Sequence, residues 1–165
     1  MSKRILISAL AAAGLASMAF SSHAATVGGS VDVQTTLTAA CEISASGAAI
    51  DFGSVVALAS SGNKAANSGS GFQVACSTGL SPTIYSATTR EMDDGATHTL
   101  AFNLCLSACT GSNDLASAAL SADTLSITQN GSLQTVALHG RILAANFKAL
   151  PAGSYAKTVT VNVDY

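Results

Sequence analysis

The residues of this sequence with the clearest chemistry are its cysteines. There are four of them: Cys41, Cys76, Cys105 and Cys109. Cysteines form disulfides in an oxidising compartment, whereas thiolates clustered with histidines bind zinc. His98 and His139 are isolated and stand at no ligand spacing, so we favour disulfides over zinc. We expect Cys41 to pair with Cys76, because both end strand-like runs, and Cys105 to pair with Cys109, because they share one local segment.

Groups for catalysis are scarce. Charged residues make up 10% of the chain, tryptophan is absent, and no G-x-S-x-G motif holds a serine nucleophile. The run EMDDG, from Glu91 to Gly95, lacks the alternating ligands and distal glutamate of a calcium loop. Its Asp-Gly ending is typical of a solvated turn. We therefore expect no enzyme, no metal and no cofactor.

The N-terminal residues predict export. Lys3 and Arg4 precede an apolar run, residues 5–20, and Ser22-His23-Ala24 is a small-x-small cleavage site, so residues 1–24 are predicted to be a signal peptide. The alternative is a membrane anchor, but that run of 16 residues is shorter than the roughly 20 that a span needs. Cleavage would leave 141 residues, enough for one domain.

The charge balance argues against nucleic acid as a partner. The predicted signal peptide carries two of the seven basic residues, which leaves five against nine acidic ones, or about −4. No basic run is present to replace phosphate counterions. We expect partners of another kind.

Most of the sequence after Ala25 alternates with a period of two, which is typical of strands with one buried face. The alternation is clear in residues 26–41, 72–76, 100–106 and 159–165. Frequent Gly, Ser, Asn and Asp residues separate these runs, so the sequence predicts an all-β sandwich.

Three local features complete this prediction. Asn130-Gly131, between two apolar runs, predicts a two-residue hairpin. Residues 61–71 are polar and are predicted to form a loop. Residues 113–123 could form about two turns of helix, with Asp114 as its cap.

The first and last strands raise a common question. The last run ends at Tyr165, so we expect its outer edge to be bare, and bare apolar edges recruit other chains. The first run offers a strand at the other terminus. We therefore expect residues 25–37 of one subunit to complete the sandwich, residues 38–165, of the next by strand addition. The alternative is a monomer in which the first strand folds back into its own domain. Gly28 and Gly29 are consistent either with close approach at a shallow pocket or with a flexible end.

Several short motifs, in this order, resemble the spore coat protein U domain of archaic, Csu-type chaperone–usher pilins. They are CEISASGAAIDFG from Cys41, FQVACSTG around Cys76, LAFNL at residues 100–104, and the ending LPAGSYAKTVTVNVDY. The resemblance runs from about Thr26 to Tyr165. Cys41 and Cys76 match the early cysteine positions of that family. Two departures stand out: Lys157 replaces a residue that is often acidic, and Cys105 with Cys109 replace Tyr and charged residues.

The resemblance implies an incomplete immunoglobulin-like β-sandwich that lacks its last strand. In such pilins a periplasmic chaperone fills the groove, and an outer-membrane usher replaces it with the N-terminal strand of the next subunit. The side chains of the donor strand would then be Val27, Gly29, Val31, Val33, Thr35 and Leu37. The strand that borders the groove would contribute Val159, Val161, Val163 and Tyr165.

The function expected from the sequence is that of a structural subunit in the shaft of a surface pilus that supports adhesion and biofilm formation. It would pass through the periplasm to the cell surface, and its partners would be identical or homologous pilin subunits, a chaperone and an usher. The alternative is a monomeric, self-complemented secreted coat or binding protein.

Overall fold

The computed structural model describes residues 27–58 and 61–165, so the predicted signal peptide, residues 1–24, lies outside the described residues. The chain divides into two units, residues 1–36 and residues 37–165, and the elements described below all belong to the second unit. Among the described residues, no helix is both long and apolar enough to cross a bilayer.

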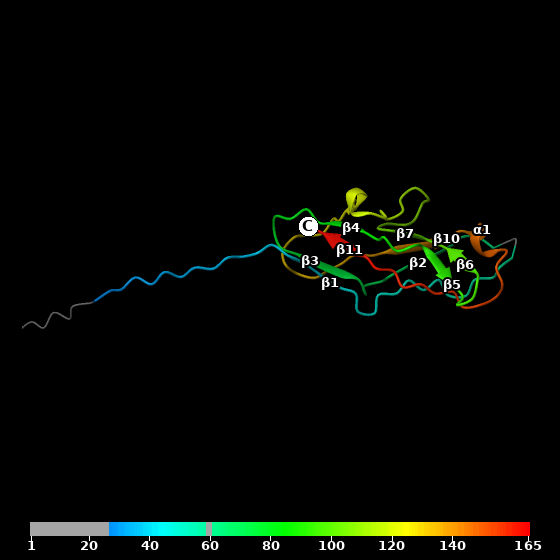
Figure 1. Cartoon of the computed structure of the whole chain (residues 1–165), viewed down its shortest axis with the longest axis horizontal. Helices are drawn as coiled ribbons and strands as arrows, with labels where there is room; N and C mark the ends of the chain where they lie inside the picture. Colours follow the sequence, from blue (N-terminus) through cyan, green and yellow to red (C-terminus); the bar gives the residue numbers. More distant parts are fainter. Residues whose placement is uncertain (1–26, 59–60) are drawn as a thin grey trace, which may run out of the picture. The chain divides into compact units, whose positions relative to one another are not determined.

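Short strands dominate the second unit (Figure 1). The strands are β1 (Cys41–Ser44), β2 (Lys64–Asn67), β3 (Gln73–Cys76), β4 (Thr83–Tyr85), β5 (Glu91–Asp93), β6 (Thr99–Ala101), β7 (Asn103–Cys105), β8 (Asp123–Thr124), β9 (Gln134–Thr135), β10 (His139–Ile142) and β11 (Asn162–Asp164). The helical elements are the 3-10 turn η1 (Ala119–Ser121) and the single turn α1 (Ala144–Phe147).

The strands form four antiparallel groups. Their orders are β1-β3-β9, β2-β10-β7, β11-β4-β8 and β5-β6. The all-β prediction is confirmed, and several antiparallel sheets around a common core are consistent with an immunoglobulin-like sandwich. Strands β1 and β11 each pair on one side only, so both are edge strands among the described residues.

Two apolar clusters form the core. The larger centres on Val74 of β3, Ile84 of β4 and Leu104 of β7, each at most 2% exposed. The smaller combines Met92, Leu100, Ile142 and Phe147. Burial of these side chains stabilises the fold by roughly 1.5–3 kcal/mol each, which explains why the alternating apolar positions of β3 and β7 point inward.

The predicted strand 100–106 is divided in the structure. Phe102 separates β6 from β7, and these two strands belong to different sheets. The N–H of Phe102 donates to the carbonyl of Arg90 at 3.0 Å, which extends the β5–β6 pairing by one residue, whereas the residues after Phe102 pair with β10. The last predicted strand, residues 159–165, is also shorter, since only β11 carries ladder pairing.

The prediction of a two-residue hairpin at Asn130-Gly131 is wrong. Gly131 makes a tight turn with φ +73°, but β8 pairs with β4 whereas β9 pairs with β3. The side-chain amide of Gln134 bonds to both the N–H and the carbonyl of Thr128, in the place where a hairpin ladder would form. The N–H of Gly131 donates to the carbonyl of Cys76 at 3.0 Å. The segment therefore crosses between sheets.

Two other local predictions also need correction. Residues 61–71 are not a loop throughout, because β2 lies within them and pairs with β10. The predicted helix over 113–123 is reduced to η1, and Asp114 does not cap it. Instead, the carboxylate of Asp114 accepts a hydrogen bond from the Asn103 amide at 2.6 Å.

Gly71 marks a close approach between two backbones. A Cβ at this position would lie 2.6 Å from the Cα of Ala48 and 2.7 Å from its backbone nitrogen. Backbone atoms cannot swing aside as a side chain does, so we expect Gly71→Ala to destabilise the domain by at least about 1–3 kcal/mol. Urea unfolding of the full chain measures this, with Gly62→Ala, which meets nothing within 4 Å, as the control. Equal midpoints for the two variants would contradict the prediction.

Candidate functional site: a groove between two strand edges

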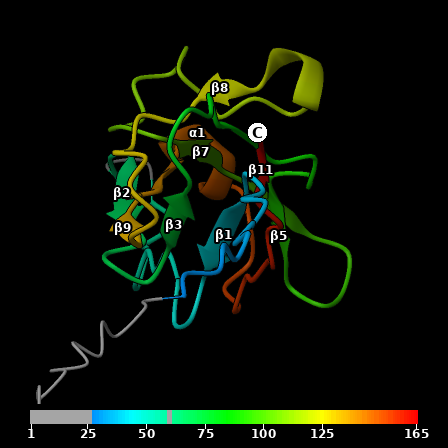
Figure 2. The ribbon, with the colours of Figure 1, turned by 90° about the vertical axis from the view of Figure 1, so that its left-hand side faces the viewer.

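A groove of about 680 Å³ opens between β1, with the residues that follow it, and the segment that leads into β11. One wall begins at Ile43 in β1 and continues through residues 48–52, and the other consists of residues 155–161, which lead into β11. Phe72, Leu104 and Leu138 form part of its floor. Figure 2 shows β1 and the C-terminal strand side by side. The groove therefore lies directly over the larger apolar cluster, and its lining includes the partly buried residues Ile50, Phe102, Val159 and Val161 that pack against that cluster.

A second cavity of about 680 Å³ continues the groove. It is lined by residues 50–57 and 150–155, and its floor includes Leu100, Ile142 and Phe147 of the smaller cluster. Both cavities share the stretch 50–52, together with Met92 and Tyr155. The two cavities together form one long channel with an apolar floor.

The C-terminal wall uses only one side of its backbone. Ala156 exchanges both hydrogen bonds with Asp93, at 3.0 and 3.1 Å. The N–H of Thr160 donates to the Thr88 hydroxyl at 3.1 Å, and its carbonyl accepts from the Ser86 hydroxyl at 2.7 Å. Backbone groups of successive residues in a strand point to opposite sides, so the odd-numbered residues direct theirs toward the open side.

No partner for these odd-numbered backbones is found within the described part of the chain. Lys157, Val159 and Val161 make no backbone hydrogen bond there. The side chains of Val159, Val161 and Val163, by contrast, are partly buried and pack against the larger cluster. The wall thus offers free main-chain donors and acceptors above a hydrophobic floor, as a strand that accepts another strand must.

The opposite wall has the same property. In residues 49–57, the backbone hydrogen bonds found among the described residues are local ones, such as the Gly53 N–H to the Asp51 carboxylate at 2.7 Å. Directly before β1, the N–H of Ser77 donates to the carbonyl of Ala40 at 2.9 Å, so Cys41 and Ile43 direct their backbones away from β3. Both walls therefore carry main-chain groups that have no partner in a ladder among the described residues.

The predicted donor residues are exposed in the isolated chain. No strand is assigned to residues 27–40, although their sequence alternates. Val27, Val31, Val33 and Leu37 are between 84% and 93% exposed. Gly29 and Thr35, the other predicted donor positions, are exposed as well. The apolar side chains of this alternating segment are thus exposed.

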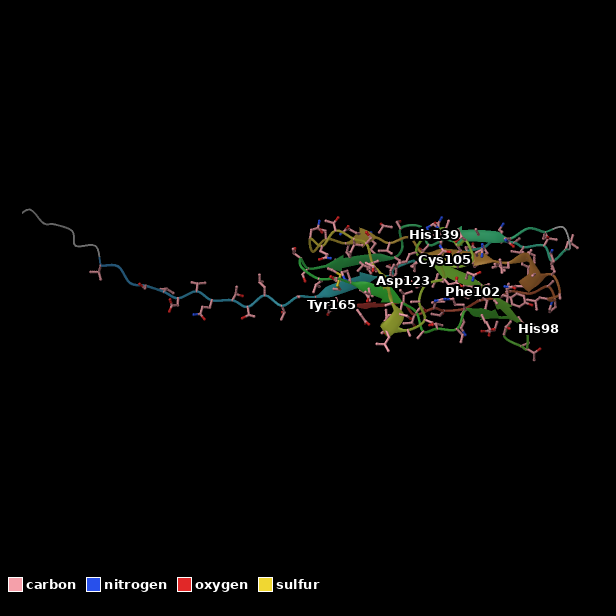
Figure 3. All side chains as sticks on the ribbon, turned by 90° about the horizontal axis from the view of Figure 1, so that it is seen from above. His98, Phe102, Cys105, Asp123, His139 and Tyr165 are labelled. Carbon is pink, nitrogen blue, oxygen red and sulfur yellow. A yellow bond between two sulfur atoms is a disulfide. The ribbon has the colours of Figure 1, made fainter. Side chains whose placement is uncertain are left out.

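The predicted acceptor residues do not all behave alike. Val159 and Val161 line the groove, whereas Val163 lies within β11 opposite Ile84 of β4. Tyr165 is 61% exposed and lines neither cavity. Figure 3 shows Tyr165 and His98 at opposite ends of the domain.

Sequence reasoning missed much of the groove. Ile50, Phe52, Met92, Phe102 and Tyr155 all lie within runs or motifs of the sequence, but none of these patterns predicts a place in the groove. The alternation of apolar residues marks positions that face inward, but it does not show which of them an open edge leaves accessible. For Ile50 and Phe52 the available signal was the apolar-x-Phe-Gly motif at residues 50–53.

Three titratable residues, Asp51, Tyr155 and Lys157, line the groove, and a pKa shift is found for Tyr155. Burial, and secondly the negative charge of Asp94, raise the pKa of the Tyr155 phenol, which stays neutral and donates to the Pro151 carbonyl at 3.0 Å. The pKa of Asp94 is lowered, chiefly by the N–H of Ala96 and then by the imidazole of His98 at 2.7 Å. The hydrogen bonds of Asp94 stabilise the turn at residues 94–98, and the hydrogen bond of Tyr155 stabilises the stretch 151–155. Among the described residues, these groups form no acid–base pair facing the groove.

The cysteines are occupied by disulfides. Cys41 is bonded to Cys76 and Cys105 to Cys109, the pairing favoured from the sequence, and no cysteine is free. The first bond joins β1 to β3 at a directly opposed pair. His139 lies opposite Cys105 in the ladder, so it has no free thiolate as a neighbour, and the described residues contain no group of metal-ligating side chains.

Two Ser-x-x-Lys spacings occur, at Ser61 to Lys64 and at Ser154 to Lys157. That spacing brings a serine nucleophile and a lysine together only on a helix, where residues three apart share a face. Neither stretch is helical, and the Ser61 hydroxyl donates to the Val56 carbonyl. In these two stretches, therefore, the spacing does not place the serine and the lysine on one helical face.

Comparison with known proteins gives the family. Residues 27–162 match the Spore Coat Protein U domain, and the chain belongs to that family. No curated protein matches the sequence. The family is a structural one of surface or secreted fimbrial proteins, so it supports a pilin-like role, in the general context of chaperone–usher pili.

Proposed function

We propose that this protein is the shaft subunit of an archaic chaperone–usher pilus and that it polymerises by donor-strand exchange. Residues 25–37 of one subunit would enter the groove of the next and complete its immunoglobulin-like sandwich. The observation that carries the proposal is a groove walled by two unpaired strand edges, in a chain whose leading segment exposes an alternating apolar face. Strand addition uses such edges for affinity and alternate side chains for specificity.

The dimensions of the two parts agree. The donor positions from Val27 to Leu37 span 11 residues, or about 36 Å when extended. The C-terminal wall of the two cavities runs over residues 150–161, a stretch of similar extended length. One donor strand can therefore cover both cavities.

Approximate energies support a stable joint. Four aliphatic donor side chains contribute about 6–12 kcal/mol when buried, and some ten main-chain hydrogen bonds add about 10 kcal/mol. Ordering eleven residues opposes this by about 11–22 kcal/mol. Apolar burial alone is insufficient, so hydrogen bonds along both walls are needed.

The proposal also assigns the partners. Because groove residues such as Ile50 and Phe102 are only partly buried and the backbones of the groove walls lack partners among the described residues, a subunit awaiting assembly needs a temporary strand, which a periplasmic chaperone would supply beside Val159, Val161 and Val163. An outer-membrane usher would then exchange that strand for the next subunit's donor. The finished fibre would lie on the cell surface, where it would support adhesion and biofilm formation.

A peptide-binding experiment tests this function. A fluorescent peptide of residues 25–38 is mixed with the full chain, and its anisotropy is followed together with size-exclusion chromatography. We expect saturable binding of the peptide and SDS-resistant ladders of the chain without it. A soluble, non-exchanging monomer that ignores the peptide would instead support the self-complemented secreted protein.

A further inference from the structure

Gly140 occupies an unusual position on the inner face of β10. Its neighbours on that face, Leu138 and Ile142, are buried core residues, whereas Gly140 contributes no side chain. A Cβ there would lie 2.7 Å from Cζ of Phe52 and 2.8 Å from Cγ2 of Ile50. Two side chains of the groove wall therefore fill the space that a residue at position 140 would otherwise occupy.

The backbone of Gly140 does not itself call for glycine. Its φ is not in the left-handed region, and it pairs regularly with Ala66 of β2 and Leu104 of β7. Alanine would fit this strand conformation and keep both ladders. The missing side chain is thus explained by what packs against it.

The wall that docks onto Gly140 has little else to hold it. Residues 49–57 make only local backbone hydrogen bonds among the described residues, and no ladder ties them to a neighbouring strand. Ile50 and Phe52 also line both halves of the groove. The packing of Ile50 and Phe52 against β10 therefore determines both the position of this wall and the depth of the channel beside it.

We infer that Gly140 is a positioning residue of the acceptor groove. Because Gly140 has no side chain, Ile50 and Phe52 pack close against β10 and leave room for a partner strand to enter the groove. This inference rests on the proposed function, and its occupant is residues 25–37 of a second copy of this chain. A methyl group at position 140 would lift both side chains off β10 and into the space that the incoming strand needs.

The test compares variants of the full chain by titration with the labelled peptide of residues 25–38. Every chain, including the wild type of this comparison, carries Val31→Asp with Val33→Asp, so that its own leading segment does not fill the groove. We expect Gly140→Ala to bind at least about tenfold more weakly than the wild type, because overpacking raises the wall. Adding Ile50→Leu and Phe52→Leu removes the three atoms nearest to the new methyl group and should recover binding. Gly62→Ala, in open space, is the matched control.

Near-UV circular dichroism and urea unfolding of each variant separate folding from binding. A folded Gly140→Ala chain with weakened binding, restored in the triple variant, supports the inference. Wild-type affinity in Gly140→Ala would overturn it, as would a folded triple variant that stays as weak as Gly140→Ala. Failure of the wild type itself to bind the peptide would reject the proposed function, and with it this role of Gly140.

Discussion

The double substitution Val31→Asp with Val33→Asp is expected to abolish the SDS-resistant ladder and leave monomers. Both side chains are at least 84% exposed in the isolated chain, so the change disturbs the subunit little. In the groove of a neighbour, however, two carboxylates would replace apolar groups, with a desolvation penalty of several kcal/mol each. We expect the joint to weaken by more than about a thousandfold, as measured by electrophoresis of unheated samples.

Its control places the same charges on the opposite face of the segment. Gln34→Asp with Thr36→Asp adds two carboxylates at even positions, which point away from the groove in an extended strand. These chains should still form ladders. A ladder that survives Val31→Asp with Val33→Asp would reject the donor assignment.

Loss of the disulfide between Cys41 and Cys76 is expected to be the largest effect within a subunit. This bond closes a separation of 35 residues and joins edge strand β1 to β3. Constraint of the unfolded chain by such a loop is worth about 3.8 kcal/mol. We expect Cys41→Ser with Cys76→Ser to lower the urea midpoint accordingly, measured in the monomeric background of Val31→Asp with Val33→Asp.

The second disulfide supplies the comparison. Cys105 and Cys109 are only four residues apart, and the same relation gives about 1.9 kcal/mol for their loop. Replacing this pair by serine should therefore destabilise the domain by about half as much. A larger loss from the short loop would show that local packing outweighs chain constraint.

The sequence predicts the central strands better than the marginal ones. Residues 72–76 alternate strongly because β3 is buried between two neighbours, and that strand is found where it is expected. β2 was missed because the exposed Lys-Ala-Ala-Asn run has no apolar face, and only pairing with β10 makes it a strand. The sequence predicts the Asn130-Gly131 turn. The strands on either side of it, β8 and β9, pair with β4 and β3 and not with each other, which local sequence cannot reveal.

The candidate site shows the same limit. Periodicity marks Val159 and Val161 as inward-facing, and the structure places them on the wall of the groove. Tyr155 and Met92, by contrast, meet only because Ala156 bridges to Asp93, a contact between residues 63 positions apart. Long-range pairing of this kind depends on the tertiary fold, so no local sequence pattern predicts it.

The placement of Cys41 has a mechanical consequence. In a fibre pulled along its axis, tension leaving the donor segment at Leu37 reaches Cys41 four residues later. There it passes through a covalent bond into the centre of the sheet at Cys76, so β1 cannot be peeled from β3 one hydrogen bond at a time. In the proposed fibre we therefore expect rupture by shearing of the whole inserted strand, a mode in which many bonds share the force.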